Sequence, residues 1–133
     1  MVKAEAKWLD GERFTAMASS QHAIVVDSDR KSNTAPGPME LVLMGLCACS
    51  LTDVVIVLNK KRQPFTSLDV RAEAERAPEP PTVYTEIKLV YTVSGKVERA
   101  AMEKAVQLSQ EKYCSVSQML QKTAKVTWEI EYR

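Results

Sequence analysis

The sequence predicts an α+β fold with the element order βββ-α-ββ-α-α-β, built around one long apolar helix. Three observations lead to this fold class: apolar and polar side chains alternate through the first part of the chain, a nearly uninterrupted apolar stretch follows, and the rest mixes alternating segments with amphipathic ones. The chain has 133 residues, of which 45% are hydrophobic and 26% charged, as in ordinary globular proteins. We therefore expect residues 1–133 to form a single domain.

The first strands form a predicted meander. Residues 2–8 alternate apolar side chains with charged ones, which is typical of a strand with one solvated face. Asp10-Gly11 then turns the chain. A weak second strand over residues 14–18 and a β-branched third strand over residues 23–26 complete the meander.

A loop and the start of a long helix come next. Residues 28–38 combine polar side chains with helix breakers and predict a loop. Pro38 suits the first helical position, where its missing N–H costs nothing, and Glu40 lies in the first turn, where the helix dipole favours an anion. Residues 60–62 are basic and suit the far end of this helix.

The long helix is apolar on nearly every side. Between residues 41 and 58 the apolar pattern is broken only by Ser50, Thr52 and Asp53. Such a helix is long enough to approach the length of a membrane span. Because Asp53 lies near its middle and the surrounding strands need a cover, we expect instead a central helix buried on both sides.

The second half of the chain predicts a hairpin and an amphipathic helix. Strands over residues 68–74 and 83–93 flank residues 77–81, which include three prolines, so the two strands should pair as a hairpin. Ser94-Gly95 then opens an amphipathic helix that ends near Tyr113.

The C-terminal segment predicts a short helix and a last strand. Ser115-x-x-Gln118 has the pattern of a capping box with Ser115 as the N-cap, so a short helix should begin there. Apolar residues alternate over 126–132, as in a strand with one solvated face.

Composition excludes several classes of function. The net charge is +1, so the chain lacks the excess of basic residues that nucleic-acid binding requires. The single histidine, His22, cannot build a multi-histidine metal site and is expected to be a surface or edge-strand side chain. The three cysteines have no C-x-x-C spacing, which argues against structural zinc. We expect neither cofactor nor metal, and no nucleic-acid or membrane partner.

The N-terminal residues contain no apolar run of the kind found in a signal peptide, so we expect a cytoplasmic protein. In a reducing compartment, three thiols are free or redox-active rather than part of a static disulfide framework.

The three cysteines have different predicted surroundings. Cys47 and Cys49 are two residues apart on a helix, about 200° in projection, and so face different neighbours. Cys114 precedes Ser115, where free N–H groups at a helix start would stabilise a thiolate, although a small side chain packed at a helix corner fits equally well. Cys49 is expected in the core beside Asp53, which raises a thiol pKa, so its reactivity needs a nearby cation or hydrogen-bond donor.

Two segments resemble the OsmC/Ohr family, which comprises osmotically inducible proteins and organic hydroperoxide resistance proteins. The first is Pro38-Met39-Glu40-Leu41 leading to Ala48-Cys49-Ser50, and the second is Glu111-Lys112-Tyr113-Cys114-Ser115-Val116-Ser117. The order of elements is similar over essentially the whole chain. The likeness is greatest to the YhfA-like branch of that family.

This resemblance implies an intertwined homodimer in which the two long helices pack against sheets from both chains, with the active site at the interface. It implies a cysteine-based peroxidase that reduces hydroperoxides, especially organic ones, in oxidative-stress defence. Carried over by motif, Cys49 is the peroxidatic thiol, Cys114 is the resolving thiol, and Cys47 is a packing residue. Their disulfide would be reduced by an external thiol.

The family also uses an arginine from the N-terminal strands and a glutamate near the start of the long helix. Met39 occupies the position expected for that glutamate, and Glu40 is its neighbour. Arg13 lies on the second predicted strand, where the arginine is expected, and Arg30 in the following loop is the rival. Within one helix, residues 39–40 lie roughly 14–15 Å from Cys49, so help from this end would come from the partner chain or through a relay.

Two other classes of function stay open. An OsmC-like protein that binds small hydrophobic molecules with little or no peroxidase turnover is the alternative that Met39 and the unassigned arginine favour. A structural or interaction protein without an accessible cavity beside Cys49 is the third.

Overall fold

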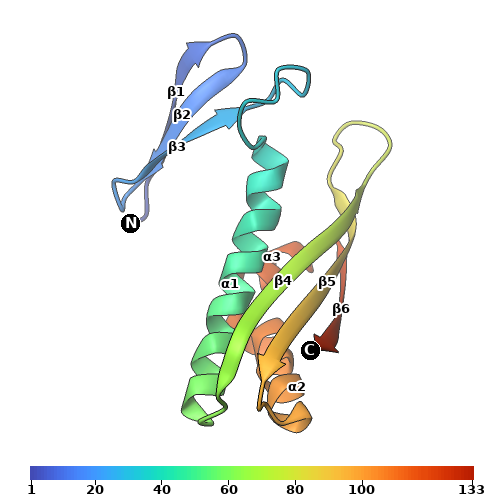
Figure 1. Ribbon diagram of the computed structural model, residues 1–133. Coiled ribbons are helices and arrows are strands. Elements are labelled where there is room, and N and C mark those ends of the chain that lie inside the picture. Colours follow the sequence, from blue (N-terminus) through green and yellow to red (C-terminus); the bar gives the residue numbers. More distant parts are fainter. The chain divides into compact units, whose positions relative to one another are not determined.

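The computed structural model describes residues 1–133 and confirms an α+β fold. The chain divides into two compact units, Met1–Met44 and Gly45–Arg133. The long helix α1 (Pro38–Lys60) contributes residues to both units (Figure 1).

The N-terminal unit contains the predicted meander. Strands β1 (Ala4–Asp10), β2 (Arg13–Ala18) and β3 (Ala23–Asp27) form an antiparallel sheet in that order. The predicted turn after Asp10 is present, and Gly11 adopts a φ of +46°, the left-handed region that glycine tolerates best.

β1 has no buried face within one chain, although its alternation predicts one. Every residue of β1 is exposed, and Trp8 keeps 69% of its surface in contact with solvent. The physical reason is that the N-terminal unit is a single sheet with no second layer over β1. The alternation in β1 therefore does not produce a buried face within the N-terminal unit.

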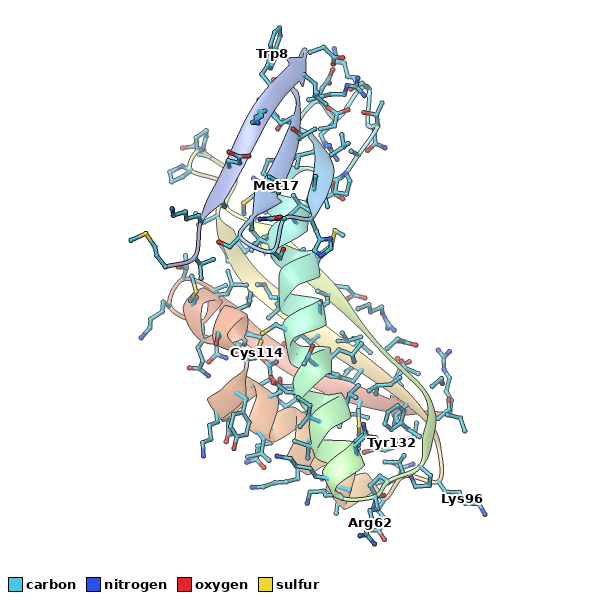
Figure 2. The ribbon with its side chains drawn as sticks, turned by 90° about the vertical axis from the view of Figure 1, so that its left-hand side faces the viewer. Trp8, Met17, Arg62, Lys96, Cys114 and Tyr132 are labelled. Carbon is cyan, nitrogen blue, oxygen red and sulfur yellow. The ribbon has the colours of Figure 1, made fainter.

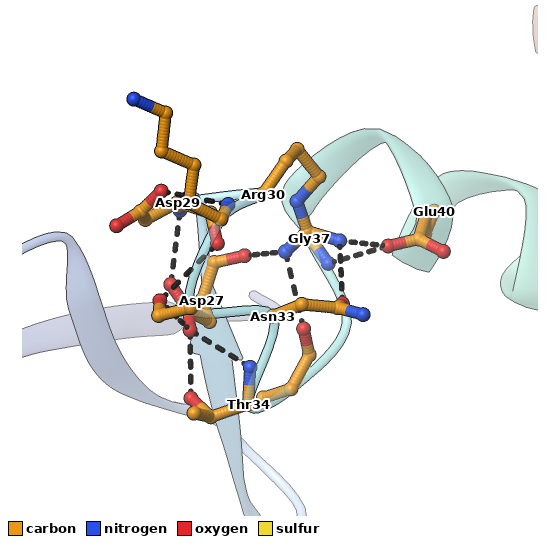
Figure 3. Close-up of polar contacts among 10 residues, drawn as sticks. Asp27, Asp29, Arg30, Asn33, Thr34, Gly37 and Glu40 are labelled. Carbon is orange, nitrogen blue, oxygen red and sulfur yellow. Dashed lines mark hydrogen bonds and ion pairs between the residues drawn. The ribbon is translucent and has the colours of Figure 1, made fainter.

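The loop before α1 is organised by the buried side chain of Asp27. Its carboxylate accepts hydrogen bonds from the backbone N–H of Thr34 at 3.0 Å, the hydroxyl of Thr34 at 2.6 Å, the hydroxyl of Ser32 at 2.8 Å and the backbone N–H of Asp29 at 2.9 Å (Figure 3). These bonds, led by the Thr34 hydroxyl, hold the pKa of Asp27 well below its usual range. The loop therefore has a defined conformation that leads into Pro38, the first residue of α1, as predicted.

The C-terminal unit holds the predicted hairpin in a second sheet. Strands β4 (Phe65–Arg76) and β5 (Tyr84–Gly95) pair antiparallel, and β6 (Lys125–Tyr132) pairs with the other edge of β5 in parallel. A parallel neighbour needs a crossover rather than a turn, and the helical segments between β5 and β6 provide it.

Those segments are α2 (Arg99–Leu108), the π-helical turn η1 (Ser109–Tyr113) and α3 (Ser115–Leu120). The sequence predicts one helix up to Tyr113, whereas the structure divides it into an α-helix and a π-helix. The amphipathic character predicted for this segment is confirmed, because α2 buries one set of side chains: Ala101, Met102, Ala105 and Val106.

Helix α1 buries a single stripe within one chain. The buried residues are Leu46, Ser50, Val54 and Leu58, which are spaced four apart. Outside this stripe its residues are partly buried or exposed, with Ile56 at 48%, so the expected burial on both sides is not found. By length and composition alone the helix is a candidate membrane span, since an 18-residue window has a mean hydropathy of 2.4.

Candidate functional site

The structure brings Cys49 and Cys114 together and keeps Cys47 apart from them. The Cys49 thiol lies close enough to Cys114 to raise the pKa of the Cys114 thiol, and both cysteines are free. Cys114 is 0% exposed, whereas Cys49 is half-buried. Cys47 contacts the backbone of Ala72 in β4, as expected from its different direction on the helix.

The π-helical turn η1 determines where Cys114 lies. The Cys114 N–H donates to the Ser109 carbonyl, five residues earlier, at 2.8 Å. This wide turn ends at Cys114, whose φ of −75° and ψ of 100° are extended. Cys114 thereby becomes the N-cap of α3, and its Sγ accepts the Ser117 N–H at 3.4 Å.

The prediction that Ser115 is the N-cap is therefore wrong by one residue, because the N-cap is Cys114. Ser115 is the first residue inside α3, because the wider π turn ends the preceding helix at Tyr113 and leaves Cys114 at the cap. The capping box pattern did not anticipate a thiol as the acceptor.

The surroundings of Cys114 favour its neutral thiol. Burial raises the pKa of Cys114, and contact with Cys49 and the charge of Asp53 raise it further, while the Ser117 N–H lowers it. Of the two readings that the sequence leaves open for Cys114, this favours the packed side chain, because desolvation outweighs the one long hydrogen bond from the start of α3. The site therefore disfavours the thiolate form of Cys114.

A buried polar network lies beside the two thiols. Ser50 hydrogen-bonds to the Tyr91 hydroxyl and, at 2.8 Å, to the Ser109 hydroxyl. The Gln110 amide donates to both the Ser50 and Tyr91 hydroxyls at 3.1 Å. The Ser117 hydroxyl donates to Gln110 Oε1 at 2.6 Å. Every buried side-chain nitrogen and oxygen atom has a partner, and burial raises the pKa of Tyr91 to about 12.

Sequence reasoning did not group these five residues, because they come from α1, β5, η1 and α3. The available signal was the polarity of Ser50, which interrupts an otherwise apolar helix. A hydroxyl in such a stripe needs a buried partner.

Asp53 connects this network to a groove. The Ser109 hydroxyl donates to Asp53 Oδ2 at 3.0 Å. Asp53 also lines a groove of about 370 Å³, together with Ile56, Val57, Lys60, Lys61, Leu108 and Tyr113. The carboxylate therefore lies between the buried hydroxyls and a partly apolar opening.

The other predicted site residues lie in the N-terminal unit. Arg13 binds the Asp10 carboxylate with two bonds of 2.8 and 2.7 Å. Glu40 pairs instead with Arg30, at 2.6 Å, and accepts the Gly37 N–H at 3.0 Å (Figure 3). The structure thus joins Glu40 to the rival arginine and gives Arg13 a different acid.

The residues of the chain offer no group of three or more His, Cys, Asp or Glu side chains that could hold a metal ion. His22 is exposed, as predicted. The chemistry available in the C-terminal unit is that of two adjacent thiols, which can lose two electrons and two protons to form a disulfide.

Comparison with known proteins gives matches to one family over most or nearly all of the chain. A family model described as OsmC-like protein matches residues 30–129. Protein YhfA of Escherichia coli (strain K12) is 40% identical over 131 residues, which cover 98% of this chain and 97% of that protein.

Solved structures show the same fold. A hypothetical protein from Aquifex aeolicus VF5 is 32% identical, with a TM-score of 0.86 and coverage of 100% of this chain and 98% of that one. An organic hydroperoxide resistance protein OsmC from Legionella pneumophila is 17% identical, with a TM-score of 0.73 and coverage of 98% and 96%, so that likeness concerns the fold alone.

Proposed function

Because the chain belongs to the OsmC-like family, we propose that it is a thiol-dependent peroxidase that reduces hydroperoxides, above all organic ones, in oxidative-stress defence. The observation that carries the proposal is the proximity of the Cys49 and Cys114 thiols in the C-terminal unit. Structures with the same fold include organic hydroperoxide resistance proteins from Legionella pneumophila and Bacillus subtilis, and the proposal extends their substrate class to this chain.

The two cysteines take different roles in this reaction. The Cys49 thiolate attacks the peroxide O–O bond, so its sulfur takes one oxygen as sulfenic acid and the alcohol leaves with the other. The Cys114 thiol then attacks the Cys49 sulfur, which gives a disulfide and releases water. An external thiol reduces the disulfide. Cys49 is the half-buried member of the pair and so the one that a peroxide reaches first.

The proposal includes a homodimer with the thiol site at its interface. Within one chain large apolar side chains stay exposed on both units, among them Trp8 at 69%, Met44 at 53% and Ile56 at 48%. Such apolar surface on a small protein indicates an interaction face. A single cytoplasmic domain formed by the whole chain in that dimer is part of the same proposal.

Arg13 and Glu40 are proposed as supporting residues, with Arg30 as the rival to Arg13. The Arg30–Glu40 ion pair places a guanidinium at the start of α1, whereas Arg13 is already held by Asp10. Comparing Arg13→Ala with Arg30→Ala separates the two: the arginine that assists Cys49 slows oxidation of its thiol when removed.

The decisive test uses stoichiometric cumene hydroperoxide. We expect rapid loss of two thiols and a disulfide that mass spectrometry maps to Cys49 and Cys114, in the wild type and in Cys47→Ser alike. Cys114→Ser should stop at the Cys49 sulfenic acid, which dimedone traps. If both thiols stay free after treatment, the peroxidase proposal is wrong.

The alternative function is binding of a small hydrophobic molecule without turnover. The groove beside Asp53 supports it, because Ile56, Val57 and Leu108 give it an apolar wall. Native mass spectrometry showing a copurified hydrophobic ligand, together with an unreactive Cys49, would favour this alternative.

A further inference from the structure

Gln110 makes three side-chain hydrogen bonds in the buried polar network near the two thiols. It is 4% exposed and lies in the π-helical turn that ends at Cys114. Its amide nitrogen donates to the Ser50 and Tyr91 hydroxyls at 3.1 Å, and its amide oxygen accepts the Ser117 hydroxyl at 2.6 Å. A buried polar group with all its partners in place is held in one orientation.

The backbone of Gln110 is anchored as well. Its carbonyl accepts a hydrogen bond from the Gln118 amide at 2.7 Å and another from the Gln121 amide at 3.0 Å. Both donors come after Cys114, so the chain before and after this cysteine is tied to one residue. Figure 2 shows Cys114 at the junction of the C-terminal helical segments, beside α1.

The bonds of Gln110 connect the two cysteines indirectly. Ser50 directly follows Cys49, and the Ser117 N–H donates to Cys114 Sγ. Gln110 hydrogen-bonds to both serines and so connects Ser50, the neighbour of Cys49, to Ser117, whose N–H donates to Cys114. The π turn, a geometry often found at functional sites, is what aims this side chain at α1.

We propose that Gln110 is a positioning residue that holds the Cys114 thiol in line with Cys49 for disulfide formation. The inference rests on the proposed peroxidase function. In this step the Cys114 sulfur attacks the sulfur of the Cys49 sulfenic acid, the S–O bond breaks, and the hydroxyl leaves as water with the Cys114 proton. The new S–S bond demands a specific separation and direction of the two side chains. Gln110 does not touch the peroxide, so the first step does not depend on it.

The test is single-turnover oxidation of the full-length protein with one equivalent of cumene hydroperoxide. Gln110→Met keeps the side-chain length but removes all three amide hydrogen bonds. We expect sulfenic acid to form on Cys49 at the wild-type rate, while disulfide formation slows by at least about tenfold, as small misplacements of reacting groups do. The matched control is Gln107→Met, since Gln107 is exposed and lies on α2 outside the network.

A second variant guards against misfolding. Ser117→Ala removes the hydroxyl that bonds Gln110 but keeps the N–H that bonds Cys114, so we expect a smaller slowing of the same step. The inference is overturned if disulfide formation keeps its wild-type rate in both variants, or if both chemical steps slow equally, which indicates general disruption. If Cys49 does not oxidise in the wild type, the proposed function itself is overturned. If Cys49 oxidises normally but Gln110→Met does not change the rate of disulfide formation, only this inference is overturned.

Discussion

Replacing Tyr91 by phenylalanine tests the buried polar network directly. Tyr91 is 0% exposed, and its hydroxyl hydrogen-bonds to Ser50 and to the Gln110 amide. Tyr91→Phe removes that one oxygen and leaves the ring to fill the same space. The change therefore isolates the polar contribution from the packing of the ring.

The expected cost follows from the partners that remain. Without the Tyr91 hydroxyl, Ser50 still bonds to Ser109 at 2.8 Å, and the Gln110 amide nitrogen still bonds to Ser50 at 3.1 Å. Ser50 and the Gln110 nitrogen each keep a partner, although one Gln110 N–H loses its acceptor, so the loss is at least the net value of two hydrogen bonds, about 1–2 kcal/mol. For a chain of this size each kcal/mol lowers Tm by about 3–5 °C.

The assay is urea denaturation at pH 7, monitored by far-UV circular dichroism. The m-values of the two proteins should be equal, so that the difference in midpoint reports the difference in stability. The matched control is Tyr113→Phe, because Tyr113 is 51% exposed and should change stability by less than about 0.5 kcal/mol. A Tyr91→Phe protein as stable as the wild type would refute the reasoning about the network.

The pH dependence provides a second check on Tyr91. Burial raises the pKa of Tyr91 to about 12, above the value of about 10 in an unfolded chain. A raised native pKa gives stability that is present below pH 10 or so and is lost as pH rises through about 12. The advantage of the wild type over Tyr91→Phe should therefore shrink in alkaline solution, and an advantage that grows would contradict the assignment.

Three further changes test other parts of the structure. Gly95→Ala should lower the free energy of unfolding in urea by at least about 1 kcal/mol, because φ is +104° and the new Cβ would lie 2.6 Å from the Pro64 carbonyl oxygen. The control Gly45→Ala should not destabilise the protein, because its Cβ would have nothing within 4 Å. In Asp27→Asn the free energy of unfolding should depend less on pH in acid. Hydrogen bonds hold the native pKa of Asp27 low, so the stability that the carboxylate contributes in the wild type is lost as pH falls below about 4. An unchanged pH dependence of acid unfolding would refute this. Disulfide formation should accelerate between pH 7 and 9, because burial raises the pKa of Cys114 and its thiolate fraction still increases there; a flat rate argues against attack by that thiolate.

Local sequence patterns predicted most of the elements. The turn at Asp10-Gly11, the helix start at Pro38 and the hairpin across the proline-rich segment are all present. Each depends on a few neighbouring residues whose backbone preferences act without the rest of the chain. The parallel pairing of β6 with β5 was not predicted, because pairing partners depend on the whole crossover.

The alternation in β1 shows that a local pattern does not by itself specify a buried face. It predicts one buried face, but Trp8 is exposed because the N-terminal unit has no second layer over this sheet. The capping box failed for a related reason, since the π turn moved the N-cap from Ser115 to Cys114. A four-residue capping pattern contains no information about whether the preceding helix ends in a π turn.

The sequence alone determined the order of helices and strands, the single apolar helix, and which cysteines belong to the two family-like motifs. Tertiary structure decided which side chains meet: Cys49 against Cys114, Glu40 with Arg30, and Ser50 with Tyr91 and Gln110. The reason is physical. Periodicity and turn chemistry act between near neighbours, whereas the bonds from Ser50 to Tyr91 and Gln110 join residues 41 and 60 positions apart and form only after the core has packed.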